Sequence, residues 1–159
     1  MSLLLVVGCS SPTSSLSSPA HSTVPSPAVA APFQAQVARC HYRAGGDLPD
    51  PTCTPGAYDP TFTVALACGG QNQARRNVPA AEKVRIAAAY GVTRAQYQEA
   101  DHLGPLALGG VNDDRNIWPE PRKAEKDAVE ARVLAAVCHG RMTLLAAQTA
   151  FTHDWRTLR

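Results

Sequence analysis

The chain has 159 residues with 15 Lys and Arg against 13 Asp and Glu, which gives a formal net charge of +2. This near-neutral balance excludes a histone-like protein that binds nucleic acid by bulk charge, and it excludes an acidic solvating tail. Every charged residue lies in 39–159, so an uncharged leader precedes a part that is large enough for one modest hydrophobic core.

The leader starts with an apolar run over 2–8 that ends at Cys9, with Val6 three positions before the cysteine and Gly8 directly before it. Residues 1–9 resemble a bacterial lipoprotein signal, in which the cysteine receives lipid and becomes the new N-terminus. The resemblance implies export and a membrane anchor through lipid on Cys9. The run is too short to span a membrane as a helix. The alternative is an apolar N-terminus with a chance cysteine.

Residues 10–36 are rich in Ser, Pro and Ala. Such a composition buries too little apolar surface to offset the entropy of ordering, so we expect a disordered tether here and one folded domain over 37–159. The expected location is outside the cytoplasm, as a membrane-anchored lipoprotein or a cell-surface or secreted protein.

The first half of the expected domain contains few regular elements. Residues 61–66 alternate polar and apolar side chains and include β-branched Thr and Val, which predicts a short strand. Pro79 opens a predicted helix over about 80–90, and Gly91 stands where its C-cap should be.

The second half is dominated by two predicted helices. An apolar stripe at helical spacing predicts a long helix over about 122–138, which ends before Gly140. Thr143 is a suitable N-cap for a last helix over 144–153.

Four cysteines lie in the expected domain. An even number in a small exported domain favours two disulfides, but four cysteines allow three pairings and the sequence alone does not choose among them. We favour one local clamp and one long cross-link. A zinc site is a weaker alternative because no CxxC or CxxH pair occurs, and free thiols are the expectation for a cytoplasmic protein. The favoured pairs are Cys40–Cys53 and Cys68–Cys138.

Asp101 and His102 form the most informative pair in the chain. A carboxylate offers a hard oxygen ligand to an ion such as Mg²⁺, and a neutral imidazole can take a proton from water. Neighbours on a strand point to opposite faces, so both reach one site only at a strand end or bend, which Gly104-Pro105 supplies.

The residues after this pair predict a hairpin followed by a helix. Gly109-Gly110 favours a tight turn, and Asn116 falls on the returning strand. From there its amide can bridge the loop backbone and hold His102 in one orientation.

This arrangement resembles the HNH nuclease motif, a ββα-metal finger, and more narrowly a group of small exported bacterial HNH-like proteins. The resemblance spans about 50–155 and implies an α+β fold, a mostly helical small domain around a hairpin-helix finger over about 98–138, braced by disulfides. The matching residues are Asp101-His102-Leu103, Leu106, Leu108-Gly109-Gly110, Asn112-Asp113, Asn116-Ile117-Trp118-Pro119, Pro121, Lys126-Asp127 and Glu130, with further matches at 53–56, 137–141, 147–148 and 154–155.

The resemblance implies a role for each matching site residue. Asp101 would be a metal ligand, His102 the general base that activates water, and Asn116 the residue that orients His102. The metal would be divalent, Mg²⁺ first with Mn²⁺, Zn²⁺ or Ni²⁺ as alternatives, and would stabilise charge on the scissile phosphate. Glu99 is a candidate for contact with the metal or its waters.

The motif also expects a His or Asn ligand on the helix, and the sequence departs from it there. Depending on the register, the equivalent position is Glu125, which can supply an oxygen ligand, or Ala124, which cannot. We therefore keep two functions open. One is an extracytoplasmic, metal-dependent nuclease of low sequence specificity, and the other is an inactive HNH-derived surface lipoprotein that binds nucleic acid or a protein partner.

Several cations are candidates for a basic rim that contacts the substrate backbone. Nothing in the sequence reads base edges, and DNA is favoured over RNA as the substrate. The strongest candidates are Arg115, Arg122 and Lys123, and Arg75 and Arg76 extend the set.

Overall fold

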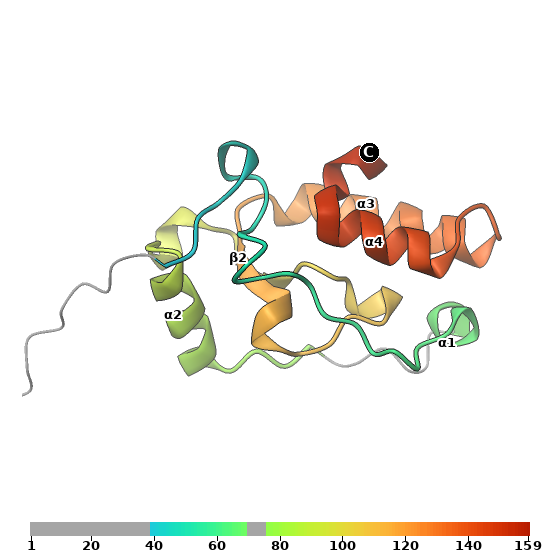
Figure 1. Cartoon of the computed structure of the whole chain (residues 1–159), viewed down its shortest axis with the longest axis horizontal. Helices are drawn as coiled ribbons and strands as arrows, with labels where there is room; N and C mark the ends of the chain where they lie inside the picture. The colour runs from blue at the N-terminus through green and yellow to red at the C-terminus, as the bar shows by residue number, and fades with distance from the viewer. Residues whose placement is uncertain (1–38, 70–75) are drawn as a thin grey trace, which may run out of the picture. The chain divides into compact units, whose positions relative to one another are not determined.

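A computed structural model of the chain describes residues 39–69 and 76–159 (Figure 1). The expected signal over 1–9, its lipidation site Cys9 and the expected tether over 10–36 lie outside the described residues. The described part combines helices with a two-stranded antiparallel sheet, which confirms the α+β class.

The sheet pairs β1 (Glu99–His102) with β2 (Ile117–Glu120), and its register places His102 opposite Ile117. The chain turns at Gly109 as predicted, but the connection between the strands is longer than one tight turn and contains two 3₁₀ turns, Leu106–Leu108 and Asp114–Asn116. Gly109 takes a positive φ of 89° to end the first of these turns.

All three longer helices follow the predicted boundaries closely. Helix α2 covers Ala80–Ala89 after Pro79, and α4 covers Leu144–Asp154 with the Thr143 side chain accepting the backbone N–H of Ala146. Helix α3 covers Lys123–Cys138. Shorter 3₁₀ turns lie at Ala44–Gly46, Arg94–Gln96 and Trp155–Leu158.

The strand predicted over 61–66 is wrong, since this segment leads into helix α1 (Val64–Gly69). The Thr63 hydroxyl accepts the backbone N–H of Leu66 at 3.3 Å, which satisfies a donor in the first turn. Cys68 is bonded to Cys138 at the end of α3, so the segment is attached to a helix. The alternation of polar and apolar residues over 61–66 carries no information about this long-range bond.

Two disulfides brace the fold, and both are the favoured pairs. Cys40–Cys53 closes a separation of 13 residues, and Cys68–Cys138 closes one of 70. Structural disulfides are typical of proteins that work in an oxidising environment outside the cytoplasm. Within 39–69 and 76–159, no helix is long and apolar enough to cross a membrane.

The hydrophobic core lies where the sheet meets α2, α3 and α4, and Figure 1 shows α3 and α4 side by side with β2 between them and α2. Trp118 of β2, Val129 of α3 and Phe151 of α4 are almost fully buried in it. The core joins the sheet and these helices in one cluster, and Lys126 of α3 contacts Asp101 and His102 at the end of β1.

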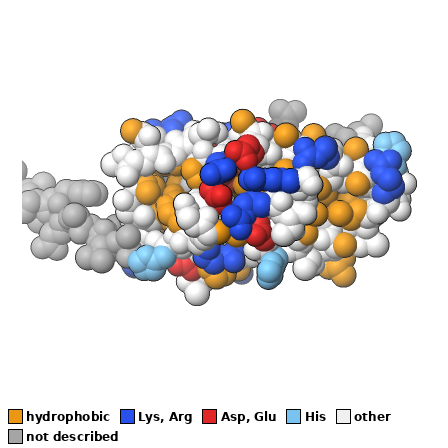
Figure 2. Space-filling model, turned by 90° about the horizontal axis from the view of Figure 1, so that it is seen from above, with side chains coloured by type: hydrophobic (Ala, Val, Ile, Leu, Met, Phe, Trp, Pro, Cys, Tyr) orange, Lys and Arg blue, Asp and Glu red, His pale blue; other side chains and the backbone are white. Residues whose placement is uncertain are grey.

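The surface carries mixed charge. On the face in Figure 2, acidic and basic side chains are interspersed rather than segregated into one patch of a single sign.

Candidate functional site

A polar cavity of about 190 Å³ lies between the end of β1 and one face of α3. Asp101 and His102 both line it, as the sequence predicted for neighbours at a strand end, and His102 is the last residue of β1. The other lining residues are Arg76, Pro105, Leu106, Ala107, Asp127 and Glu130.

A larger cavity of about 270 Å³ lies beside the Cys40–Cys53 disulfide. Its lining combines apolar side chains such as Ile86 and Ile117 with Arg39, Arg85 and Asp114, and it includes no histidine. The smaller cavity is the one of the two that combines an imidazole with carboxylates.

The imidazole of His102 is buried, and its Nε2 lies 2.9 Å from the side-chain oxygen of Asn112. The backbone N–H of Asn77 donates to that same oxygen at 3.0 Å, so the oxygen accepts both bonds. The ring therefore donates from Nε2, and the neutral imidazole keeps its lone pair on Nδ1. Burial holds the pKa of His102 below its usual 6.5, which favours this neutral form at pH 7.

The side chain of Asn116 holds the loop between the two strands. Its Oδ1 accepts the N–H of Gly104 at 2.7 Å, and its Nδ2 donates to the carbonyls of Gly104 and Val111, both at 3.0 Å. Asn116 thus bridges the loop backbone, whereas the contact with the His102 ring comes from Asn112. The Asn116 side chain therefore affects the position of His102 indirectly, through the backbone of the loop that follows β1.

The carboxylate of Asp101 is buried and bound by two cations. Arg76 donates to Oδ1 at 2.9 Å, and Lys126 donates to Oδ2 at 3.1 Å. Burial by itself raises the pKa of Asp101. The two cations lower it by more than burial raises it, so the net pKa lies below its usual range. Asp101 is therefore an ion-paired carboxylate at neutral pH.

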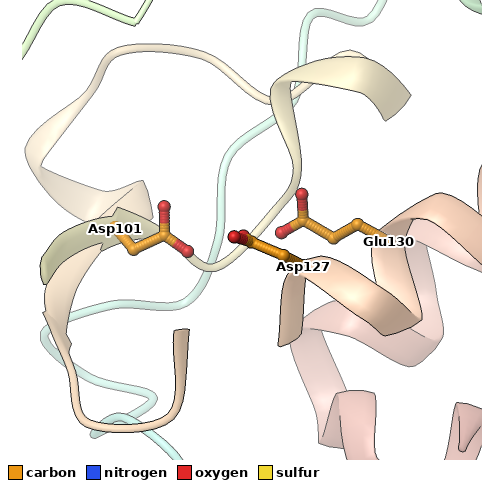
Figure 3. Close-up of side chains that lie close together, drawn as sticks. All are labelled: Asp101, Asp127 and Glu130. Atoms are coloured by element: carbon orange, nitrogen blue, oxygen red, sulfur yellow. The ribbon is translucent and has the colours of Figure 1, made fainter. Parts of the chain in front are cut away.

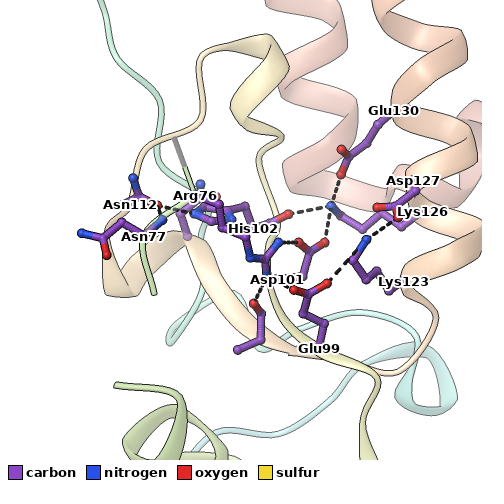
Figure 4. Close-up of polar contacts among 12 residues, drawn as sticks. Arg76, Asn77, Glu99, Asp101, His102, Asn112, Lys123, Lys126, Asp127 and Glu130 are labelled. Carbon is purple, nitrogen blue, oxygen red and sulfur yellow. Dashed lines mark hydrogen bonds and ion pairs between the residues drawn. The ribbon is translucent and has the colours of Figure 1, made fainter. Parts of the chain in front are cut away.

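Lys126 is fully buried at the centre of this arrangement (Figure 4). Its ammonium donates to Asp101, to Glu130 and, at 2.6 Å, to the backbone carbonyl of His102. Burial lowers the pKa of Lys126, but Asp101 and Glu130 raise it above its usual value, so the side chain stays charged.

Asp101, Asp127 and Glu130, which we call the carboxylate cluster, bring oxygens within 4.8 Å of one another (Figure 3). Hard oxygen ligands suit the divalent metal that the resemblance implies. Each of these carboxylates, however, already binds a protein cation, and the Lys126 ammonium contacts both Asp101 and Glu130. The residues present do not fit a divalent ion while Lys126 keeps this position.

Glu125 lies apart from the carboxylate cluster. Its Oε1 pairs with Arg122 at 3.3 Å and its Oε2 with Arg159 at 2.8 Å, and its side chain is half exposed. Ala124, the other candidate, has no side chain that binds a ligand. Neither position of the predicted helix ligand is among the groups that line the cavity.

The predicted substrate cations are dispersed. Lys123 is near the cavity, 3.5 Å from Glu99 and paired with Asp127, whereas Arg122 pairs with Asp47 at 2.7 Å and Arg115 with Asp113 at 2.9 Å. Glu99 also binds Arg76 at 2.9 Å, so it belongs to the same ion-pair network.

Four residues of this site had no role assigned from the sequence: Asn112, Lys126, Asp127 and Glu130. For the three residues on α3 the helical period carries a signal, because Asp127 lies four residues after Lys123 and three before Glu130, and Glu130 lies four after Lys126. A Lys-Asp pair followed three residues later by Glu therefore indicates a helix face that meets charged groups.

Comparisons of the chain with protein-family models, with curated proteins and with solved structures found no match.

Proposed function

We propose that the chain is a nuclease that cleaves phosphodiester bonds of nucleic acids outside the cytoplasm, with low sequence specificity. The observation that carries this proposal is the shared cavity of His102 and Arg76, in which a neutral imidazole lies beside a guanidinium. Phosphodiester cleavage needs a base that accepts a proton from water and a group that binds the phosphate.

His102 is the proposed general base. Its lone pair on Nδ1 can accept the proton of an attacking water, and its lowered pKa keeps it in the accepting form at neutral pH. The bond from Nε2 to Asn112 fixes both the ring orientation and the tautomer. This is the arrangement that a base needs before a substrate arrives.

Arg76 is the proposed phosphate ligand. About a third of its side chain is exposed, so a substrate can reach it. A guanidinium has five N–H donors; those of Arg76 bind Asp101, Glu99 and the Ala100 carbonyl from the protein side, and two donors remain for phosphate oxygens. Asp101 and Glu99 bind it from the protein side, at 2.9 Å each, and so fix its place at the cavity.

The proposed location agrees with the two disulfides, which suit an oxidising environment. Export and lipidation at Cys9 are part of the same proposal and rest on the leader sequence.

Purified full-length chain should be assayed on supercoiled plasmid DNA and on RNA, with Mg²⁺ and with a chelator. We expect His102→Ala to lower the cleavage rate by about 100-fold or more, the usual contribution of a general base. His153→Ala is the matched control, because His153 is exposed on α4 and should leave the rate unchanged. Equal rates for His102→Ala and the native chain would remove His102 from the mechanism.

The second candidate is an inactive HNH-derived surface lipoprotein that binds nucleic acid or a protein partner. The engagement of every member of the carboxylate cluster by protein cations favours it. If the native chain cleaves neither DNA nor RNA with Mg²⁺, Mn²⁺, Zn²⁺ or Ni²⁺, this candidate replaces the nuclease.

A further inference from the structure

The ammonium of Lys126 has a complete set of partners. Its three N–H donors meet three oxygens, one each from Asp101, Glu130 and the backbone carbonyl of His102. The ring of Phe151 lies 5.7 Å from the ammonium and belongs to the hydrophobic core. The lysine is thus held by oxygens and backed by an aromatic ring.

These partners are of the type that binds hard metal ions. Two carboxylate oxygens and a backbone carbonyl are common ligands of Mg²⁺ and Ca²⁺ in proteins. The same three groups here surround a cation that is covalently part of α3. An ion that used Asp101 and Glu130 together would have to displace an ammonium whose side chain is fully buried.

The charges around Lys126 are nearly balanced without any added ion. Four carboxylates belong to the network, and three protein cations bind them (Figure 4). A divalent ion would find little uncompensated negative charge there. The carboxylates are Glu99, Asp101, Asp127 and Glu130, and the cations are Arg76, Lys123 and Lys126.

We propose that Lys126 is a resident cation that replaces a divalent metal at this site. It binds the Asp101 carboxylate and the His102 carbonyl at once, and so fixes the end of β1 against α3. Lys126 acts through these two residues and is a positioning residue. Its role in cleavage rests on the proposed function, whereas its role as a substitute for a metal does not.

The direct test is metal binding by the native full-length chain. Mn²⁺ is the probe, followed by the loss of its free-ion electron paramagnetic resonance signal and by calorimetric titration. We expect no binding at the site up to about 1 mM Mn²⁺ and no change in the melting temperature. Stoichiometric binding at micromolar Mn²⁺, abolished by Asp101→Asn, would overturn the proposal.

Lys126→Met supplies a second readout that loss of packing alone would not produce. Removal of the ammonium leaves Asp101, Asp127 and Glu130 facing one another, so the variant should melt at a lower temperature and should gain Mn²⁺ binding. We expect saturating Mn²⁺ to raise its melting temperature by about 5 °C or more. A folded variant that Mn²⁺ does not stabilise would contradict the proposal.

Lys123→Met is the matched control. It removes the same charge from the same network, but Lys123 is about a third exposed and contacts Asp127 and Glu99 from the rim. We expect little loss of stability and no gain of Mn²⁺ binding. An equal gain in both variants would mean that overall charge, and not the position of Lys126, controls metal binding.

Activity gives the third readout and separates this inference from the proposed function. We expect the native chain to cleave nucleic acid at the same rate in Mg²⁺ and in a chelator. Cleavage that stops in chelator and returns with Mg²⁺ would overturn the role of Lys126 but leave the nuclease intact. Absence of cleavage under all conditions would remove the nuclease, and the Mn²⁺ measurements would still decide on Lys126.

Discussion

The side-chain oxygen of Asn112 accepts a bond from the His102 ring at 2.9 Å and another from the backbone N–H of Asn77 at 3.0 Å. One amide oxygen thereby sets the tautomer of the proposed base. The ring and its partner lie ten positions apart in the chain, on β1 and in the loop that leads to β2.

The first prediction concerns the pKa of His102. Asn112→Asp places a carboxylate against Nε2 and should raise this pKa, because an opposite charge favours the protonated ring. Since the neutral ring is the proposed base, the acid limb of the pH–rate profile should move to higher pH. The titration of the ring proton by NMR measures the pKa without reference to activity.

Asn77→Asp controls for a general effect of negative charge, because Asn77 is exposed and contacts Asn112 through its backbone. It should move the His102 pKa much less. Equal shifts in the two variants would show that the contact at Nε2 does not govern the ring.

The second prediction concerns Glu120, a fully buried carboxyl at the end of β2. Its Oε1 accepts the N–H of Arg122 at 2.6 Å, and its Oε2 has no hydrogen-bond partner among the described residues. Burial raises its pKa from 4.5 to about 8. Between these values the folded chain keeps a proton that the unfolded chain has released, so the free energy of unfolding contributed by Glu120 falls as the pH rises.

Glu120→Gln removes this titration. From about pH 5 to pH 9 the native chain loses free energy of unfolding that the variant keeps. The free energy of unfolding of the variant minus that of the native chain should therefore rise by about 3 kcal/mol or more over this range. Urea unfolding at both pH values measures the change. Glu125→Gln is the control, since its half-exposed carboxylate pairs at the surface, and it should follow the native pH dependence.

The third prediction concerns the two disulfides. In the chain-entropy description, a cross-link stabilises more when it closes a longer loop. Replacing both Cys68 and Cys138 by Ser, which opens a separation of 70 residues, should cost about 4 kcal/mol. Replacing Cys40 and Cys53, which are 13 residues apart, should cost about 3 kcal/mol. Denaturant unfolding of the two double variants would contradict this account if the order were reversed.

Local signals were sufficient for the longer helices. Pro79 before α2 and Thr143 before α4 mark their starts in the sequence, and Gly140 marks the end of α3. The segment at 61–66 shows the opposite case. Its alternation is compatible with a strand, but a strand needs a partner, and the Cys68–Cys138 bond attaches the segment to α3 instead.

The site was only partly predictable for a similar reason. The adjacency of Asp101 and His102 at a strand end is a local feature and follows from the residues that come after them. The burial of Lys126 depends on three acceptors that come from β1 and α3 together. The spacing of Lys126, Asp127 and Glu130 indicates a charged helix face, but a lysine on such a face is usually solvated, so the spacing does not predict that the ammonium is buried.

The short sheet also has a consequence for self-association. Pro119 gives β2 a position with no N–H to donate, and its carbonyl accepts the hydroxyl of Tyr42 at 3.0 Å. On the other strand, the carbonyl of Ala100 accepts from Arg76. The outward-facing carbonyls at Ala100 and Pro119 are thus already bonded on both edges of the two-stranded sheet. An added strand could not pair with them, which protects the sheet from edge-to-edge aggregation.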